Sequence, residues 1–229
     1  FRIIGGVDIN STSLKTYELN YGTPVMNADI TTISPNSNVV QQTFKINKKR
    51  PLVVIGCAPC QGFSAHRKKD SDKPEDKRNT LIGYFSDIAV NLNPDFVVME
   101  NVPEILTGKY KKHYEEAKNV FIQNGYYVVQ RVYNAAGFGV PQARIRAIIV
   151  ASKDKNFVLP DEMLSVEEYK TVRDAIADLP HVDARHQTQM ADRYHRCSTH
   201  KQSTIDVIAQ VPHDGGSRPK GIGPKCLDK

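Results

Sequence analysis

The chain has 229 residues and is 40% hydrophobic, enough for one large domain, or one domain with a smaller companion, around a packed core. It has no apolar stretch of the roughly 18 residues that a membrane span needs, no signal-peptide pattern at its N-terminus, and too few cysteines, four, for a disulfide scaffold. Its net charge of +6 favours an anionic partner without identifying it. We therefore expect an intracellular protein with reduced thiols and no membrane contact, cytoplasmic in a bacterium or nuclear in a eukaryote.

The first quarter of the chain predicts a strand, a helix and a second strand. Residues 2–7 are typical of a short buried strand, and Asp8 stands at its end. Residues 10–12 are candidate caps for a following helix, which the turn-forming residues 20–24 should end. Residues 52–55 then form a continuous apolar run, as expected for a parallel strand that is covered on both faces.

The middle of the chain continues this alternation. A polar loop is expected at residues 66–79, followed by a helix at residues 79–91, where apolar side chains recur at helical spacing. Residues 96–99 predict another buried strand. The remaining expected elements are a helix at residues 111–124 and strands at residues 126–133 and 145–151.

Strands that alternate with helices indicate an α/β sheet. Beyond about residue 152 the apolar clusters become short, with one expected helix at residues 172–179 and a polar tail. We therefore divide the chain into a main α/β domain at residues 1–160 and, at residues 161–229, a linker with the beginning of a smaller second domain.

Unusual residues stand where three of the expected strands end. They are Asp8, the triplet Pro59-Cys60-Gln61, and the triplet Glu100-Asn101-Val102. Ligands of open α/β sheets bind at the carboxyl ends of the strands, so these loops should converge on one edge. Position alone does not assign a function, because a cysteine there is more often a buried thiol and a glutamate more often a solvated carboxylate.

The local sequences at these positions resemble the motifs of a known protein family. Three segments resemble, in order and spacing, the central motifs of the DNA cytosine-5 methyltransferase family: Gly56-Cys57-Ala58-Pro59-Cys60-Gln61-Gly62-Phe63-Ser64, Met99-Glu100-Asn101-Val102-Pro103 and Gln142-Ala143-Arg144-Ile145-Arg146. Residues 28–31, 78–81 and 172–180 extend the likeness over most of the chain. The resemblance implies a Rossmann-like, S-adenosylmethionine-dependent methyltransferase sheet with helices on both faces, followed by the start of a target-recognition domain.

The resemblance also implies a reaction. Cys60 would add to C6 of a cytosine flipped out of double-stranded DNA, while Glu100 binds N3 and the exocyclic amine. Arg144 and Arg146 match the arginines that anchor cytosine O2 and the nearby phosphate or thiolate. The activated C5 would then accept a methyl group. The resemblance assigns further substrate contacts to Gln61, Ser64, Asn101 and Gln142.

The same resemblance implies the cofactor site. Asp8 suits the ribose hydroxyls of S-adenosylmethionine and Asp29 the adenine amine, and the product would be S-adenosylhomocysteine. The apolar neighbours of the cofactor would be Ile9, Ile30, Pro59 and Leu81. We expect no metal, and we expect a monomer whose partner is DNA, with residues 66–69 on its phosphates.

The match is incomplete at both ends. The family's glycine-rich first motif would stand before Phe1, and its later motifs would follow Lys229. We therefore expect this 229-residue chain by itself to bind S-adenosylmethionine poorly and to turn over negligibly.

Three alternatives stay open at this point. The first is a transfer-RNA cytosine-5 methyltransferase with the same motifs, and the second is a degenerate DNA-binding relative without activity. The third interprets Cys57-x-x-Cys60 as a redox pair or half of a zinc site. The third leaves the Glu100-Asn101 pair unexplained.

Overall fold

The structure is a computed structural model that describes residues 1–58, 80–180, 182, 195, 198–212 and 218–223. The chain divides into two compact units, Phe1–Ala175 and Ile176–Lys229. The expected division into domains at residue 160 stays a prediction. The polar loop expected at residues 66–79 lies outside the described residues.

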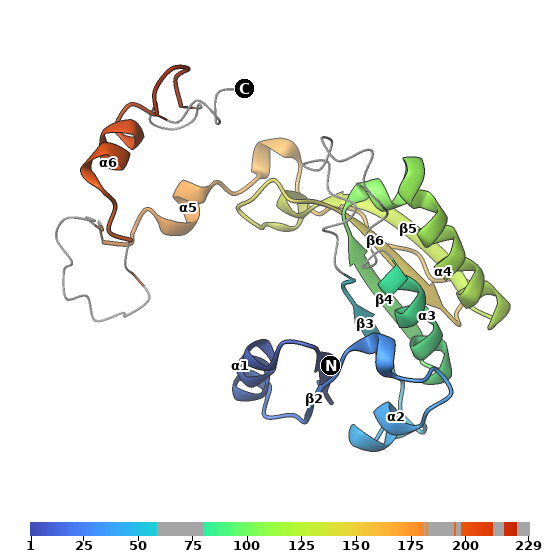
Figure 1. The fold of residues 1–229 in the computed structure, drawn as a ribbon. Coiled ribbons are helices and arrows are strands. Elements are labelled where there is room, and N and C mark those ends of the chain that lie inside the picture. Colours follow the sequence, from blue (N-terminus) through green and yellow to red (C-terminus); the bar gives the residue numbers. More distant parts are fainter. Residues whose placement is uncertain (59–79, 181, 183–194, 196–197, 213–217, 224–229) are drawn as a thin grey trace. The chain divides into compact units, whose positions relative to one another are not determined.

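The first unit contains two sheets (Figure 1). In the smaller sheet, β1 (Gly6–Asp8) pairs in parallel with β2 (Val25–Asn27), and α1 (Ser11–Tyr21) connects them. The larger sheet has the strand order β3-β4-β6-β5, in which β3 and β4 are parallel and the other pairs antiparallel. Its strands are β3 (Val53–Gly56), β4 (Phe96–Asn101), β5 (Tyr127–Asn134) and β6 (Ile145–Ser152). The α/β class is thus confirmed.

Helix α1 begins and ends as its sequence predicts. The side chain of Asn10 accepts hydrogen bonds from the backbone N–H groups of Thr12 and Ser13, which are otherwise unpaired in the first turn. At the other end, Gly22 adopts a left-handed conformation with φ +61° and donates to the carbonyl of Glu18.

Strand β1 is shorter than expected, because residues 2–5 do not pair with a neighbouring strand. Gly5 makes contacts with side chains in place of strand pairing. The Tyr17 hydroxyl donates to the carbonyl of Gly5 at 3.3 Å, and the Phe44 ring lies where a Cβ of residue 5 would stand.

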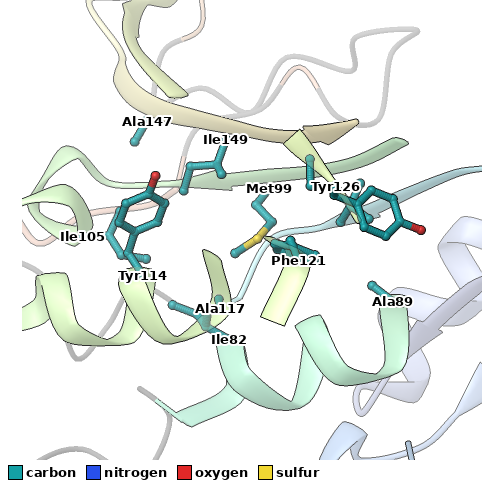
Figure 2. Packing of buried hydrophobic residues seen from close by; sticks show 12 residues of the cluster. Ile82, Ala89, Met99, Ile105, Tyr114, Ala117, Phe121, Tyr126, Ala147 and Ile149 are labelled. Carbon is teal, nitrogen blue, oxygen red and sulfur yellow. The ribbon is translucent and has the colours of Figure 1, made fainter. Parts of the chain in front are cut away.

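The core of the first unit lies between the larger sheet and two helices, α3 (Leu81–Asn91) and α4 (Lys111–Gln123), which pack side by side on one face of it (Figures 1 and 2). The strands contribute alternate residues, as the two-residue period of a strand requires. Met99 lies among these side chains, and Phe121 from α4 is 1% exposed. Burying one such side chain contributes about 1.5–3 kcal/mol.

A smaller apolar cluster joins α3 to the N-terminal segment. Ile88 of α3 and Leu92, the residue after that helix, pack there with Ile33 and with Val40 of α2 (Val39–Thr43). The 3-10 turn η1 (Ile30–Thr32), which follows β2, also lies against α3.

The opposite face of the larger sheet is only partly covered by the described residues. Phe157, after β6, packs edge-to-face on Phe96 of β4. Ile55 of β3, however, is 69% exposed, so the expectation that this strand is covered on both faces is wrong for the described part of the chain.

The remaining helices are short. Helix α5 (Val172–Ile176) covers only part of the helix expected at residues 172–179, and α6 (Gln202–Ile208) lies in the second unit. Among the residues that the structure describes, no helix combines the length and apolar character needed to cross a membrane.

Candidate active site

The carboxyl ends of β3 and β4 lie next to each other, because the two strands are parallel and Gly56 pairs with Met99. The loop that leaves β3 therefore begins beside the segment that leaves β4. Cys57 and Ala58 are the last described residues of this loop, and they lie beside Glu100 and Asn101 respectively. The expected convergence of these two loops is confirmed up to residue 58.

Glu100 is the centre of a charged cluster. Its Oε1 atom lies 2.8 Å from Nε of Arg146 and 3.3 Å from Nη2 of Arg144. The three side chains come together because β6 runs antiparallel to β4, which brings the start of β6 to the end of β4. Glu100 and Arg146 are partly buried, with exposed fractions of 30% and 25%, whereas Arg144 is exposed, at 46%.

The strand β4 turns Glu100 and Asn101 to opposite faces of the sheet. Asn101 shares the core face with Val97 and Met99, whereas Glu100 lies on the other face with Arg146. The glutamate is thus kept out of the apolar core and next to its cationic partners.

Asn101 is buried, at 2% exposure, and both ends of its amide are hydrogen-bonded. Its Nδ2 donates to the carbonyl of Ala58 at 3.3 Å, and its Oδ1 accepts from the backbone N–H of Val102 at 2.9 Å. These bonds tie the loop after β3 to the end of β4. The predicted contact of Asn101 with substrate stays a prediction.

Gly56 lets α3 approach this loop closely. A Cβ at residue 56 would stand 2.3 Å from the ring of Phe85, so a larger residue would push the helix and the strand end apart. The sequence marks Phe85 only as an apolar helix position, and this contact could not be inferred from it. A glycine directly after an apolar strand is the one signal that points to such an approach.

The thiol of Cys57, the described cysteine of this loop, lies beside the charge of Glu100. Burial raises the pKa of the Cys57 thiol and the charge of Glu100 raises it further, while the Glu100 backbone N–H and Arg144 lower it by less. Because the thiolate is the reactive form, a raised pKa disfavours nucleophilic attack by Cys57.

Several predicted site residues lie outside the described part of the chain: Pro59, Cys60, Gln61 and Ser64. The interpretation of Cys57 and Cys60 as a redox or zinc pair is likewise untested. Gln142 is described, and it lies exposed two residues before Arg144, in the loop between β5 and β6.

The two acidic residues predicted to bind cofactor lie at one edge of the smaller sheet. Asp8 ends β1 and pairs with Asn27, the last residue of β2. Asp29 follows Asn27 by two residues, so both acidic residues stand at the same ends of the two strands. The Asn27 amide donates to the carbonyls of Asp8 and Ile9, which holds the two strand ends together. Ile9 is 68% exposed beside them.

Each of these carboxylates also caps its own turn. Asp8 accepts from the N–H of Asn10 at 2.7 Å, and Asp29 accepts from the N–H and hydroxyl of Thr31. The Thr31 bonds lower the pKa of Asp29, so it is ionised at neutral pH. Of the predicted apolar neighbours, Ile30 begins η1 and Leu81 begins α3, the helix against which η1 lies.

Comparisons with known proteins agree with this architecture. The sequence profile of the family described as C-5 cytosine-specific DNA methylase matches residues 1–216. The chain is 33% identical over 216 residues to the type II methyltransferase M1.HphI of Haemophilus parahaemolyticus, covering 94% of this chain and 56% of that protein. It is 32% identical over 186 residues to M.XorII of Xanthomonas oryzae, covering 80% of this chain and 42% of that protein. The chain thus spans about half the length of these relatives.

Solved structures show the same fold. A prophage-encoded protein of E. coli, provisionally described as a DNA modification methyltransferase, superimposes with a TM-score of 0.62 and 27% identity, over 78% of this chain and 49% of that one. The Entamoeba histolytica methyltransferase EhMeth gives a TM-score of 0.52 at 22% identity, over 69% of this chain and 47% of that one, which shows likeness of fold alone. The fold is therefore the Rossmann-like fold of S-adenosylmethionine-dependent methyltransferases.

Proposed function

The chain belongs to the family of C-5 cytosine-specific DNA methylases, and on this premise we propose that the protein methylates C5 of cytosine in double-stranded DNA. The observation that carries the proposal is the cluster of Glu100, Arg144 and Arg146 beside the loop that leads to Cys60. A carboxyl group with two guanidinium groups presents both acceptor and donor chemistry to the edge of a cytosine ring.

Cys60 is the nucleophile in this proposal. Its thiolate forms a bond to C6 of the cytosine, and the electron pair of the C5–C6 double bond moves to C5. Cys57 is the other cysteine of the loop, and its raised pKa argues against it in this role. The C5 atom then takes the methyl group that S-adenosylmethionine would supply, and the broken sulfur–methyl bond would leave S-adenosylhomocysteine. Loss of the C5 proton restores the double bond and releases the Cys60 thiolate.

Glu100 stabilises the charge that develops during the attack. Its carboxyl group shares a proton with N3 of the cytosine and accepts a hydrogen bond from the exocyclic amine, which draws electron density away from C6. Arg146 and Arg144 contact this carboxyl group through Oε1. In the proposal they also bind O2 of the same base. Because a stacked base cannot reach these groups, the target nucleotide must flip out of the duplex.

The edge of the smaller sheet fits an adenosine group. Asp8 and Asp29 are acceptors for the ribose hydroxyls and the adenine amine, and the exposed Ile9 and the start of η1 at Ile30 offer apolar surface to the ring. Support for this assignment is the shared edge that β1 and β2 give the two acidic residues.

The proposal is tested with the full-length protein and duplex DNA that carries 5-fluorocytosine, whose C5 fluorine cannot leave as a proton does. We expect a covalent protein–DNA adduct that requires S-adenosylmethionine. Cys60→Ser should abolish the adduct, and the matched control Cys57→Ser should retain it. An adduct that survives Cys60→Ser would refute the assignment of the nucleophile.

The same assay distinguishes the substrate. Adduct formation on 5-fluorocytosine RNA but not on DNA would assign the protein to RNA methylation. The absence of adducts on both polymers, with an intact fold, would indicate a relative without activity.

A further inference from the structure

Residues 160–164, which follow β6 and a short connection, run along the edge of the larger sheet and are called the strap here. Strand β5 is one of the two edge strands of this sheet, so within the described part of the chain its outward backbone groups have no neighbouring strand to pair with. The backbone N–H of Asn134, the last residue of β5, donates to Oε1 of Glu162 at 2.9 Å. The side chain of Glu162 thus pairs with one outward N–H group at the end of this edge strand.

The strap also contacts the loop between β5 and β6. The backbone N–H groups of Met163 and Leu164 both donate to the carbonyl of Gly137, at 2.9 and 3.0 Å. The fit is close, because a Cβ at residue 137 would stand 2.4 Å from Oε2 and 2.9 Å from Cβ of Glu162. Residue 137 therefore has to be a glycine for the strap to lie where it does.

The first half of the strap makes further contacts, of which the ion pair of Asp161 is exposed to solvent. Arg131 donates to the carbonyl of Pro160 at 3.0 Å and pairs with Asp161 at 2.6 Å, and the hydroxyl of Tyr133 also donates to the Pro160 carbonyl. Tyr169, which follows the strap in the chain, donates a hydrogen bond from its hydroxyl to Oε2 of Glu162 at 3.4 Å. Both carboxylate oxygens of Glu162 are therefore engaged.

The residues that the strap holds are the base of the loop that carries Arg144. Asn134 accepts through its side chain from the N–H of Ala136, and the N–H of Ala135 donates to the carbonyl of Arg144 at 2.9 Å. The path from Glu162 to Arg144 thus runs through Asn134 and Ala135, neighbours in the chain. Arg146, two residues later, pairs with Tyr133, whose hydroxyl binds the strap.

From these contacts we propose that Glu162 is a positioning residue for Arg144 and Arg146. The strap fixes the β5–β6 loop so that both guanidinium groups meet Oε1 of Glu100. This inference rests on the proposed function, because the arginines matter only if Glu100 binds the target base.

The test uses four variants of the full-length protein: Glu162→Ala, which removes the acceptor, Glu162→Gln, which keeps an acceptor oxygen, Gly137→Ala, which displaces the strap, and Asp161→Ala. The last is the matched control, because it removes the same charge from the neighbouring residue, whose side chain is 93% exposed. Methyl transfer to DNA, KM for DNA, and thermal unfolding are measured for each.

We expect kcat to fall about ten- to a hundredfold in Glu162→Ala and Gly137→Ala, as for misplaced reactive groups. KM for DNA should change by less than about threefold, since the strap positions groups that act in the transition state. Glu162→Gln and Asp161→Ala should stay within about threefold of wild type in kcat, because the amide keeps an acceptor oxygen and the Asp161 pair is a surface salt bridge.

The inference is overturned if Glu162→Ala or Gly137→Ala keeps wild-type kcat, or if Glu162→Gln loses as much activity as Glu162→Ala. It is also overturned if kcat falls only in proportion to the unfolded fraction. Should Glu162→Ala not fold, Gly137→Ala and Glu162→Gln decide the matter. An inactive wild-type protein would instead contradict the proposed function itself, so the two failures are distinguishable.

Discussion

Arg146 and Arg144 approach the same oxygen of Glu100, at 2.8 Å and 3.3 Å, from one side of the larger sheet. Arg146 makes the shorter contact through Nε and is the more buried of the two arginines. The two contacts are therefore unequal, and Arg146 is the principal partner of the glutamate.

Replacement of Arg146 should reduce methyl transfer strongly. We expect Arg146→Ala to lower kcat about 10²–10³-fold, the usual effect of removing a preorganised donor from an active site. Arg146→Lys should recover only part of this loss, because an ammonium group lacks the planar fork of a guanidinium. Steady-state kinetics on duplex DNA measure both, with the exposed Lys155→Ala as control. Equal rates for Arg146→Ala and wild type would contradict the proposed role.

Replacement of Asn101 should affect stability as well as activity. Asn101→Ala leaves the carbonyl of Ala58 and the N–H of Val102 without their partner, which should cost about 1–3 kcal/mol in the free energy of unfolding. Chemical denaturation measures this change. The control is Asn156→Ala at an exposed position, where a change within about 0.5 kcal/mol is expected. Equal midpoints for the two variants would show that the Asn101 bonds contribute little.

Two glycines near α3 should respond oppositely to alanine. Gly56→Ala places a Cβ against the ring of Phe85 and should destabilise the protein by about 1–3 kcal/mol. Gly83→Ala, within α3, meets no atom within 4 Å and should stabilise it by about 0.5–1 kcal/mol through helix propensity. Thermal unfolding of both variants tests the packing, and destabilisation of similar size in both would argue against it.

Cys57 can report on the charges of the cluster. Its thiol pKa is raised, so alkylation of Cys57 should remain slow at neutral pH and reach its plateau at a higher pH than for an ordinary thiol. Glu100→Gln removes a charge that raises this pKa and should shift the profile to lower pH, while Arg144→Ala should shift it to higher pH. Mass spectrometry of the Cys57 peptide in a Cys60→Ser background measures the rates. If the pH dependence of alkylation is unchanged in both variants, the charges of Glu100 and Arg144 do not affect the pKa of Cys57.

The elements of the fold were largely predictable, because each depends on local chemistry. The Asn10 cap and the Gly22 stop define α1 in both sequence and structure. The β1 strand was predicted too long, since its start is held by Tyr17 and Phe44, which are distant in sequence. Apolar pattern alone also misjudged Ile55, because an exposed face of a strand can be as apolar as a buried one.

The residues of the candidate site were predictable, but the packing contacts that hold them in position were not. The family resemblance of their segments groups Glu100, Arg144 and Arg146 at one site, and the structure places them in contact. Neither the ring of Phe85 behind Gly56 nor the carboxylate of Glu162 beside Gly137 has a motif of its own. Such contacts depend on tertiary packing between segments, which a single sequence does not encode in any local pattern.

Glu100 and Asn101 point to opposite faces of β4. This part of the protein should therefore tolerate amino-acid substitutions but not a change in the length of the strand. A conservative substitution at a neighbouring position leaves each side chain on its own face. Insertion or deletion of a single residue within β4 would exchange the faces of the residues after it, turning a carboxylate toward the core side chain of Ile149 and an amide toward the arginines. Frame-preserving indels in this strand should therefore be far more damaging than point substitutions.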